Sequence, residues 1–206
     1  MKQIIMLGAF VETIELCEEC GYDIVGIFDN YVQGVYCGYP ILGRDEDLIL
    51  QKDKYINIPL VIVPDAPRVR ERMYQIYKEN GFSFETVISP KAIISKSAFI
   101  DEGCIIQAGC NISSEVKLGK CVRVNTFANI MHETFVEDFS IVAQNAVILG
   151  RCRVGKKSYI GANATILPNR LVRENAIVGA AAVVTKDVAV GNVVVGNPAR
   201  KLKDVE

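Results

Sequence analysis

The sequence predicts two structural units, an α/β domain over residues 1–87 and a solenoid of short parallel strands over residues 88–206. Segments typical of strands and helices alternate in the first unit, and an aliphatic residue recurs at every sixth position in the second. Half of the 206 residues are hydrophobic, and 23 Lys and Arg nearly balance 24 Asp and Glu. This composition indicates a folded protein rather than a disordered or fibrous one.

The first unit is expected to form a parallel, Rossmann-like sheet because its strands and helices alternate. The last helix has proline in its first turn and Gly81 just past its end. The turn Gly8-Ala9-Phe10 lacks the glycine pattern that binds a dinucleotide, so no NAD or FAD site is expected. The expected strands are Gln3–Leu7, Asp23–Phe28 and Pro59–Val63, and the expected helices are Phe10–Cys20, Asp45–Gln51 and Pro67–Asn80.

The second unit is built on a repeat of six residues. From Ile88 to Val190, every sixth residue is Ile, Val or Leu, without an inserted loop, and the residue four places later is small or β-branched except at Arg170. This period fits neither a helix nor an alternating strand. It fits a solenoid in which three repeats make one coil and the aliphatic side chains form a shared core. Glycines are expected to free the backbone at corners, as at Gly119, Gly155, Gly161 and Gly179.

The single histidine, His132, is the strongest candidate for chemistry. It lies two places after the inward Ile130, so the register places it at a corner or on an outer face of the solenoid. The neighbouring Glu133 can fix the tautomer of the imidazole and stabilise its protonated form. The pair therefore predicts a general base.

Several classes of protein are not expected. The balanced charge argues against nucleic acid as a partner, and the uncharged stretches are too short for a spanning helix, so we expect no membrane partner and a cytoplasmic location. No metal is expected, because Cys17-x-x-Cys20 has no second cysteine pair or histidine cluster beside it. Three cysteines of the repeat, Cys104, Cys110 and Cys152, occupy inward positions and are expected to be core residues.

The repeat resembles that of the left-handed parallel β-helix family, whose members are mostly acyltransferases. Over its whole length the chain is similar to the bacterial sialic-acid O-acetyltransferase-like family, and especially to nucleotide-sugar 4-amino N-acetyltransferases of the bacillosamine-pathway type. The segments that carry this resemblance are Asn125-Thr126, His132-Glu133, Gly150, Gly161-x-Asn163, Leu167-Pro168-Asn169, Val178-Gly179, Val195-Gly196-Asn197-Pro198-Ala199, Gly38-Tyr39-Pro40-Ile41-Leu42-Gly43 and the Asp29-Asn30 pair.

The resemblance implies an acetyl-CoA-dependent N-acetyltransferase that acts on the amino group of a nucleotide-linked 4-amino-deoxy sugar, with UDP as the expected nucleotide. It implies that His132 removes the proton of the amine, assisted by Glu133 and Asn125, and that the Gly150 N–H stabilises the oxyanion. It also implies a homotrimer with active sites between subunits. The residues implied at CoA are Ile141, where the family has a second histidine, Gly150, Ala162 and Ala180, and those implied at the nucleotide sugar are Asp29 and Asn30.

The trimer has support in the sequence itself, since large apolar residues near His132 have an outward register and would suit an interface. They are Phe127, Met131, Phe135 and Phe139.

Three alternatives use the same fold. A carbonic anhydrase would need about three histidines on a zinc ion, and the chain has one. A sugar O-acetyltransferase would use the same base and the same oxyanion donor. A non-catalytic scaffold or sensor would have no use for the His132-Glu133 pair.

Overall fold

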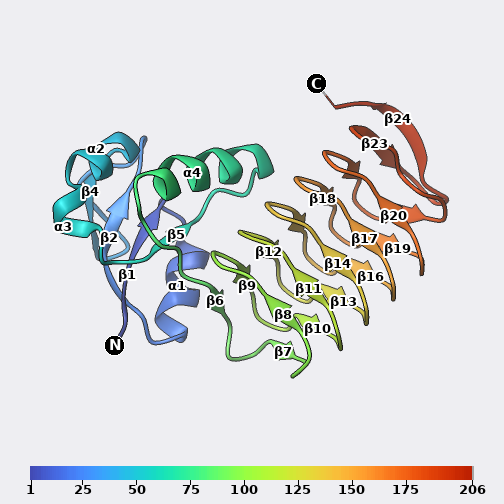
Figure 1. Ribbon diagram of the computed structural model, residues 1–206, viewed down its shortest axis with the longest axis horizontal. Helices are drawn as coiled ribbons and strands as arrows, with labels where there is room; N and C mark the ends of the chain where they lie inside the picture. The colour runs from blue at the N-terminus through green and yellow to red at the C-terminus, as the bar shows by residue number, and fades with distance from the viewer. Residues whose placement is uncertain (206) are drawn as a thin grey trace.

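The computed structural model describes residues 1–205 and has two parts joined along the side of a prism (Figure 1). The first part is a five-stranded sheet in the order β3-β4-β2-β1-β5 with helices around it. Its elements are β1 (Gln3–Leu7), α1 (Val11–Glu19), β2 (Asp23–Phe28), β3 (Val35–Tyr36), β4 (Tyr39–Gly43), α2 (Asp45–Leu50), α3 (Lys52–Tyr55), β5 (Leu60–Ile62) and α4 (Pro67–Glu79).

The predicted parallel sheet is confirmed in its centre, where β1 pairs in parallel with both β2 and β5. The edge differs from the prediction, because β3 and β4 form an antiparallel hairpin and β4 continues the sheet in parallel beside β2. This hairpin is not among the expected strands, and Gly34–Gly43 contains three glycines and a proline, which are uncommon within strands. Isoleucine and leucine side chains on β4 nevertheless pack against the sheet.

The second part is a parallel β-helix of two-residue strands, each ending at one aliphatic residue of the repeat. We number its three faces by their strands. The strands of the first face are β6 (Val87–Ile88), β9 (Ile105–Ile106), β12 (Arg123–Val124), β15 (Ile141–Val142), β18 (Tyr159–Ile160) and β21 (Ile177–Val178), extended by β23 (Asn192–Val195) and β24 (Arg200–Asp204).

The other two faces complete the prism. The strands of the second face are β7 (Ile93–Ile94), β10 (Asn111–Ile112), β13 (Asn129–Ile130), β16 (Val147–Ile148), β19 (Thr165–Ile166) and β22 (Val183–Val184). The strands of the third face are β8 (Phe99–Ile100), β11 (Lys117–Leu118), β14 (Phe135–Val136), β17 (Arg153–Val154) and β20 (Leu171–Val172).

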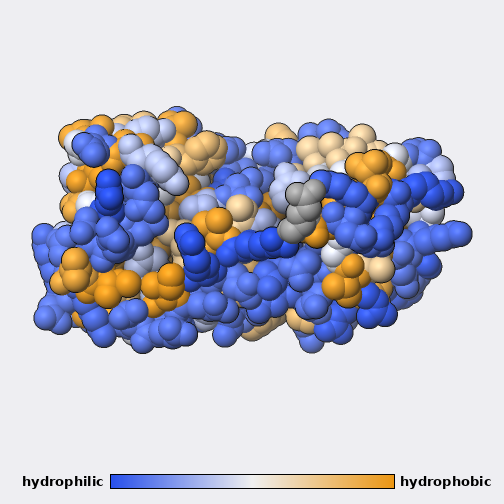
Figure 2. All heavy atoms as spheres, turned by 90° about the horizontal axis from the view of Figure 1, so that it is seen from above, coloured by the Kyte–Doolittle hydropathy of each residue, from blue (hydrophilic) through white to orange (hydrophobic). Residues whose placement is uncertain are grey.

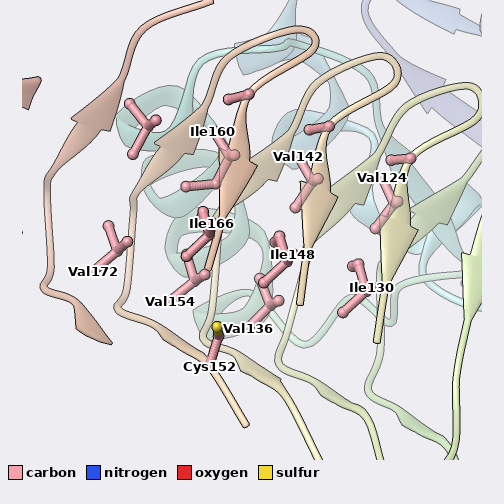
Figure 3. Packing of buried hydrophobic residues seen from close by; sticks show 14 of the residues in the cluster. Val124, Ile130, Val136, Val142, Ile148, Cys152, Val154, Ile160, Ile166 and Val172 are labelled. Carbon is pink, nitrogen blue, oxygen red and sulfur yellow. The ribbon is translucent and has the colours of Figure 1, made fainter. Parts of the chain in front are cut away.

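The repeat positions form the core of the β-helix as predicted. Figure 3 shows one side chain per strand, such as Val124, Ile130 and Val136, directed into the interior of the prism. Every face contributes one aliphatic residue per coil, so the stacked coils share a continuous apolar column. Cysteines 104, 110 and 152 belong to this core, as expected.

The last coil departs from the predicted register. Val188 forms the bridge to Val172 and is buried, whereas Val190 is 52% exposed. The turn after Val184 is two residues shorter than the earlier ones, and β23 then pairs through Val194 with Val178. Val190 is therefore not a core residue, and the repeat ends at Val184.

The corner glycines have a different role from the predicted one. The left-handed conformation recurs at every sixth residue from Gly103 to Ala181, and these residues include Glu133 and Phe127 but only two glycines. The four glycines 119, 155, 161 and 179 do not have this conformation. A Cβ atom on Gly161 would come within 2.6 Å of a backbone nitrogen of the next coil. These glycines therefore permit the close stacking of coils.

The first face of the β-helix is covered by the α/β part. The outward residues Val87 and Ile105 join the cluster formed by β1, β2 and α1. Phe139, which we expected at a subunit interface, is also buried, because the ring of Tyr74 on α4 lies 5.4 Å from its ring. Figure 2, seen from above, shows a mostly hydrophilic surface with hydrophobic residues in separate patches, and β24 lies exposed on the molecule.

Candidate active site

His132, Glu133 and Arg151 form a hydrogen-bonded group at the second corner, between the second and third faces. The Nδ1 atom of His132 lies 2.9 Å from Oε2 of Glu133, and Arg151 Nε donates to the same oxygen at 3.0 Å. The His132 side chain is 47% exposed, as its register predicted. The hydrogen bond from His132, together with Arg151, lowers the pKa of the Glu133 carboxyl below its ordinary value. Glu133 is therefore a carboxylate that accepts a hydrogen bond from the Nδ1–H group of His132, which leaves Nε2 as the basic nitrogen.

Gly150 lies directly beside this imidazole, one coil further along. A Cβ atom on Gly150 would come within 2.6 Å of both Cε1 and Nε2 of His132. The carbonyl of His132 accepts a hydrogen bond from the Arg151 N–H, which keeps the two coils in register. Only glycine leaves room for the ring at this position, so the fold brings Gly150 and the basic nitrogen together.

Asn125 lies at the first corner, between the first and second faces. Its side chain is almost fully buried, and its Oδ1 accepts a hydrogen bond from Arg123 Nε at 2.8 Å. Arg123 is itself buried and also donates to the carbonyl of Val63, and its Nε lies 3.4 Å from Asp65. Burial raises the pKa of the Asp65 carboxyl, and Arg123 opposes this shift. The α/β part therefore fixes the orientation of Asn125.

A pocket of about 340 Å³ opens between the two parts of the molecule, and we name it the junction pocket. It brings together the turn after β1, the end of β2 and the first corner of the β-helix. Its lining residues are Gly8, Ala9, Phe10, Glu12, Asp29, Tyr31, Val63, Pro64, Asp65, Arg123, Asn125 and Gln144.

Of the two residues expected at the nucleotide sugar, Asp29 lines this pocket and shapes its loops, whereas Asn30 does not. Both carboxylate oxygens of Asp29 accept backbone hydrogen bonds, one from Ala9 at 2.8 Å and the other from the N–H groups of Tyr31 and Val32. Asn30 does not line the junction pocket, and its side chain holds Asp45 at the start of α2. Asp29 thus joins the two loops that form the pocket, which its position after β2 did not indicate.

The residues expected at CoA do not lie together. Ala162 and Ala180 are stacked on consecutive coils of the first corner, above Gln144, and Ala181 N–H donates to the Ala162 carbonyl. Gly150 lies at the second corner instead. Ile141 is 0% exposed on the first face, beneath the α/β part, so its side chain is not accessible to a bound molecule. The expected contact of Ile141 with CoA stays a prediction, which this burial of the side chain does not favour.

Within one chain, the expected base and the expected acceptor pocket lie at opposite edges of the second face. Asn125 precedes β13 at one corner, and His132 follows β13 at the other. The junction pocket includes Asn125 but not His132.

Sequence reasoning missed several residues of these sites. Arg151 could have been found, because it lies eighteen residues after Glu133 and three repeats make one coil. Arg123 has an outward register, but only the docking of the α/β part buries it. Asp65 follows β5 at the edge of the sheet, where its approach to Arg123 depends on that same docking.

Among the described residues, no group of three or more His, Cys, Asp or Glu side chains could hold a metal ion. The Cys17 thiol is buried, and this burial raises its pKa to about 12, so it is a core residue rather than a reactive one. In the described part of the chain, no helix is both long and apolar enough to cross a bilayer.

No protein-family model matches the chain. Its structure is similar to that of a histidine variant of perosamine N-acetyltransferase from Caulobacter crescentus, in complex with CoA and GDP-perosamine (TM-score 0.93, 24% identity, 99% of this chain and 98% of that one). It is equally similar to the acetyltransferase domain of PglB from Neisseria gonorrhoeae (TM-score 0.93, 27% identity, 98% and 100% coverage), which has also been solved with acetyl coenzyme A (TM-score 0.92, 27% identity, 98% and 99% coverage). The resemblance found in the sequence is thus confirmed over the whole fold.

Proposed function

We propose that this protein is an acetyl-CoA-dependent N-acetyltransferase that acts on the amino group of a nucleotide-linked 4-amino-deoxy sugar. Its similarity to CoA-bound sugar N-acetyltransferases along nearly the entire chain supports an acyltransferase that uses acetyl-CoA as the donor. The observation that carries the proposal is the His132–Glu133 pair beside Gly150 at an exposed corner. UDP is the nucleotide that the family resemblance implies, and the Caulobacter enzyme holds a GDP-linked sugar.

His132 is the proposed general base. Glu133 accepts a hydrogen bond from Nδ1–H, so Nε2 has a free electron pair on the side of Gly150. The sugar amine attacks the thioester carbonyl, and Nε2 takes the proton that the nitrogen loses as the N–C bond forms. The tetrahedral intermediate then releases CoA as its thiolate, which receives that proton from the imidazolium. The products are the N-acetyl sugar and CoA thiol, and no covalent enzyme intermediate is needed.

Gly150 is the proposed donor to the oxyanion. Its carbonyl accepts from Asn169, while its N–H has no hydrogen-bond partner among the described residues. This N–H is next to the ring that receives the proton. A free backbone donor at that point can stabilise the negative charge that develops on the thioester oxygen.

The two halves of the proposed site come together in a homotrimer. The outward residues of the second face carry no charge, which suits packing around a threefold axis. When three such faces meet, the second corner of one subunit lies against the first corner of the next. His132 of one subunit would then reach the Asn125 corner of its neighbour. The outward residues of this face are Ile93, Asn111, Asn129, Val147, Thr165 and Val183.

The junction pocket is the proposed site of the nucleotide sugar. Residues 1–87 form the Rossmann-like domain that holds the nucleotide, with the Asp29–Asn30 loops shaping the site, and residues 88–206 form the left-handed β-helix that carries the transfer. CoA would lie along the first corner, where Ala162 and Ala180 leave little side-chain bulk beside the backbone. Asn125, which Arg123 holds in place, lies where the two substrates would meet.

Release of free thiol from acetyl-CoA, measured with a panel of UDP- and GDP-linked amino sugars, tests this function. We expect turnover with a 4-amino sugar and a loss of at least about a hundredfold in His132→Ala, because a general base contributes that much. Turnover only with sugars that lack the amine would assign the enzyme to O-acetylation. Failure to bind CoA at all would favour the non-catalytic scaffold.

A further inference from the structure

A second pocket adjoins the junction pocket at Glu12. This helix pocket has a volume of about 360 Å³ and lies between α1 and the first corner of the β-helix. Glu12 lines both pockets, and the consecutive residues Asn125 and Thr126 line one each. The two pockets therefore offer one extended site along the first corner. The helix pocket is lined by Glu12, Glu15, Leu16, Glu19, Lys91, Gln107, Ala108 and Thr126.

Glu12 is a half-buried carboxylate of this site that makes no hydrogen bond or ion pair among the described residues, although its charge acts on Arg123. Lys91 forms an ion pair with Glu19, and Arg123 pairs with Asp65. Backbone N–H groups occupy both oxygens of Asp29. Within residues 1–205, no hydrogen bond or ion pair engages the side chain of Glu12. The five carboxylates that line the two pockets outnumber Lys91 and Arg123, so the point where the pockets meet is negative and attracts a cation.

Gln107 supplies an independent sign of a missing ligand. Its side chain is 2% exposed in the wall of the helix pocket, and its Oε1 accepts the N–H of Thr126 at 3.1 Å. Its Nε2 is buried without a hydrogen-bond partner in the described structure. A buried amide donor of this kind is costly unless an acceptor binds it. A ligand that carries both a cationic group and an acceptor oxygen would complement this site, because the cation would pair with Glu12 and the oxygen would accept from Gln107.

We propose that Glu12 selects the amine-bearing acceptor by binding its ammonium group, while a sugar oxygen accepts a hydrogen bond from Gln107. This inference rests on the proposed function and identifies the residue that distinguishes an amino sugar from its hydroxyl counterpart. It also predicts that a sugar with a carboxylate at this position is repelled. The ammonium group releases one proton to water before it attacks, and His132 takes the second proton during acetyl transfer.

Calorimetric titration without acetyl-CoA separates this inference from the catalytic proposal. The ligands are a UDP-linked 4-amino-4,6-dideoxy sugar, GDP-perosamine, and the 4-hydroxy counterpart of each. We expect the wild type to bind its amino sugar about tenfold more tightly than the hydroxyl counterpart, as a half-buried charge pair provides. Glu12→Gln should remove this preference, and Glu12→Asp should retain most of it.

Glu18→Gln is the matched control, because Glu18 lies on the same helix outside both pockets. It should leave the preference unchanged. Gln107→Met should weaken the binding of the amino sugar and of the hydroxyl sugar by the same factor. The methionine cannot donate a hydrogen bond, and the sugar oxygen that accepts it is present in both ligands. A Glu12→Gln protein that still prefers the amino sugar would overturn the inference even if the wild type acetylates that sugar. A wild type that binds the amino sugar without acetylating it would instead contradict the proposed function alone.

Discussion

The ring of His132 occupies the space that any side chain on Gly150 would need, since a Cβ atom there would lie 2.6 Å from Nε2. The two residues are eighteen apart in the sequence, so they meet because three repeats complete one coil. This contact places a basic nitrogen beside a backbone N–H with no partner among the described residues. The stacking of two coils thus positions the proposed base beside the proposed oxyanion donor.

Gly150→Ala tests this relationship. The added methyl group must push the imidazole away from its place, so we expect acetyl transfer to fall by about a hundredfold or more. The melting temperature should change little, because the His132 ring is exposed and can move. Gly26→Ala is the matched control, because a Cβ atom there also meets a side chain, that of Leu42 at 2.6 Å, away from His132. Unchanged turnover in Gly150→Ala would show that the ring does not act from this position.

Glu133→Gln should lower the turnover rate by at least about tenfold, because the amide no longer holds the imidazole in the tautomer with a basic Nε2. Steady-state kinetics should show a fall in kcat with little change in the KM for acetyl-CoA. Glu115 has the same left-handed corner conformation one coil earlier, so Glu115→Gln is a matched control. Equal rates in the two variants would remove Glu133 from the mechanism.

The end of the repeat can be located by two valines. Val188→Ala should lower the free energy of unfolding by about 1–3 kcal/mol, since it removes buried methyl groups. Val190→Ala should change it by less than about 0.5 kcal/mol, since Val190 is exposed. Chemical denaturation of both variants checks the register. A larger loss of stability in Val190→Ala than in Val188→Ala would show that the six-residue repeat continues to Val190.

The contact between α4 and the β-helix should weaken in acid. Glu71 accepts ion pairs from Lys156 at 2.7 Å and Lys157 at 2.9 Å. Burial raises the pKa of Glu71, but the two lysines together outweigh it and bring the pKa below its ordinary value. Such a carboxylate stabilises the fold above the pKa of the unfolded chain, and this contribution is lost as the pH falls through the folded-state pKa.

We therefore expect Glu71→Gln to lower the melting temperature at pH 7 and to have a smaller effect below about pH 4. Melting curves of both proteins between pH 3 and pH 8 provide the measurement, with Glu115→Gln as the control. A difference that stays constant across this range would show that the ion pairs contribute nothing.

The proposed trimer should depend on the uncharged second face. Val147→Glu would place three carboxylates near the threefold axis, so we expect dissociation to monomers and loss of turnover. Lys117→Glu changes the charge of the third face instead and should leave the trimer intact. Analytical ultracentrifugation measures the mass of the assembly that each variant forms. A Val147→Glu protein whose assembly has the wild-type mass would exclude this face as the interface.

The core of the β-helix could be predicted from the sequence because its signal is local and periodic. The position of each aliphatic residue in the repeat indicates that its side chain points inward. The exposure of His132 follows from its place two residues after Ile130. The same reasoning failed where a distant segment decides the outcome. Phe139 has an outward register but lies under Tyr74 of α4. Ile141 is likewise covered by the α/β part.

The candidate site was predictable only in part for a related reason. The His132–Glu133 pair is local, whereas the position of Asn125 depends on Arg123 and on the docking of the α/β part. The shortened turn after Val184 keeps aliphatic residues at both possible registers, so the pattern alone could not distinguish Val188 from Val190. A buried side-chain donor without a partner, such as Nε2 of Gln107, has no signature in a single sequence.

Complementation between two inactive variants tests the central claim most directly. His132→Ala and Asn125→Ala chains are unfolded together, refolded as a mixture, and assayed with acetyl-CoA and the 4-amino nucleotide sugar. If each site takes His132 from one subunit and Asn125 from its neighbour, about one quarter of the sites in random trimers are intact. We predict recovery of about that share of wild-type turnover. Activity no higher than that of either variant alone would contradict a site shared between subunits.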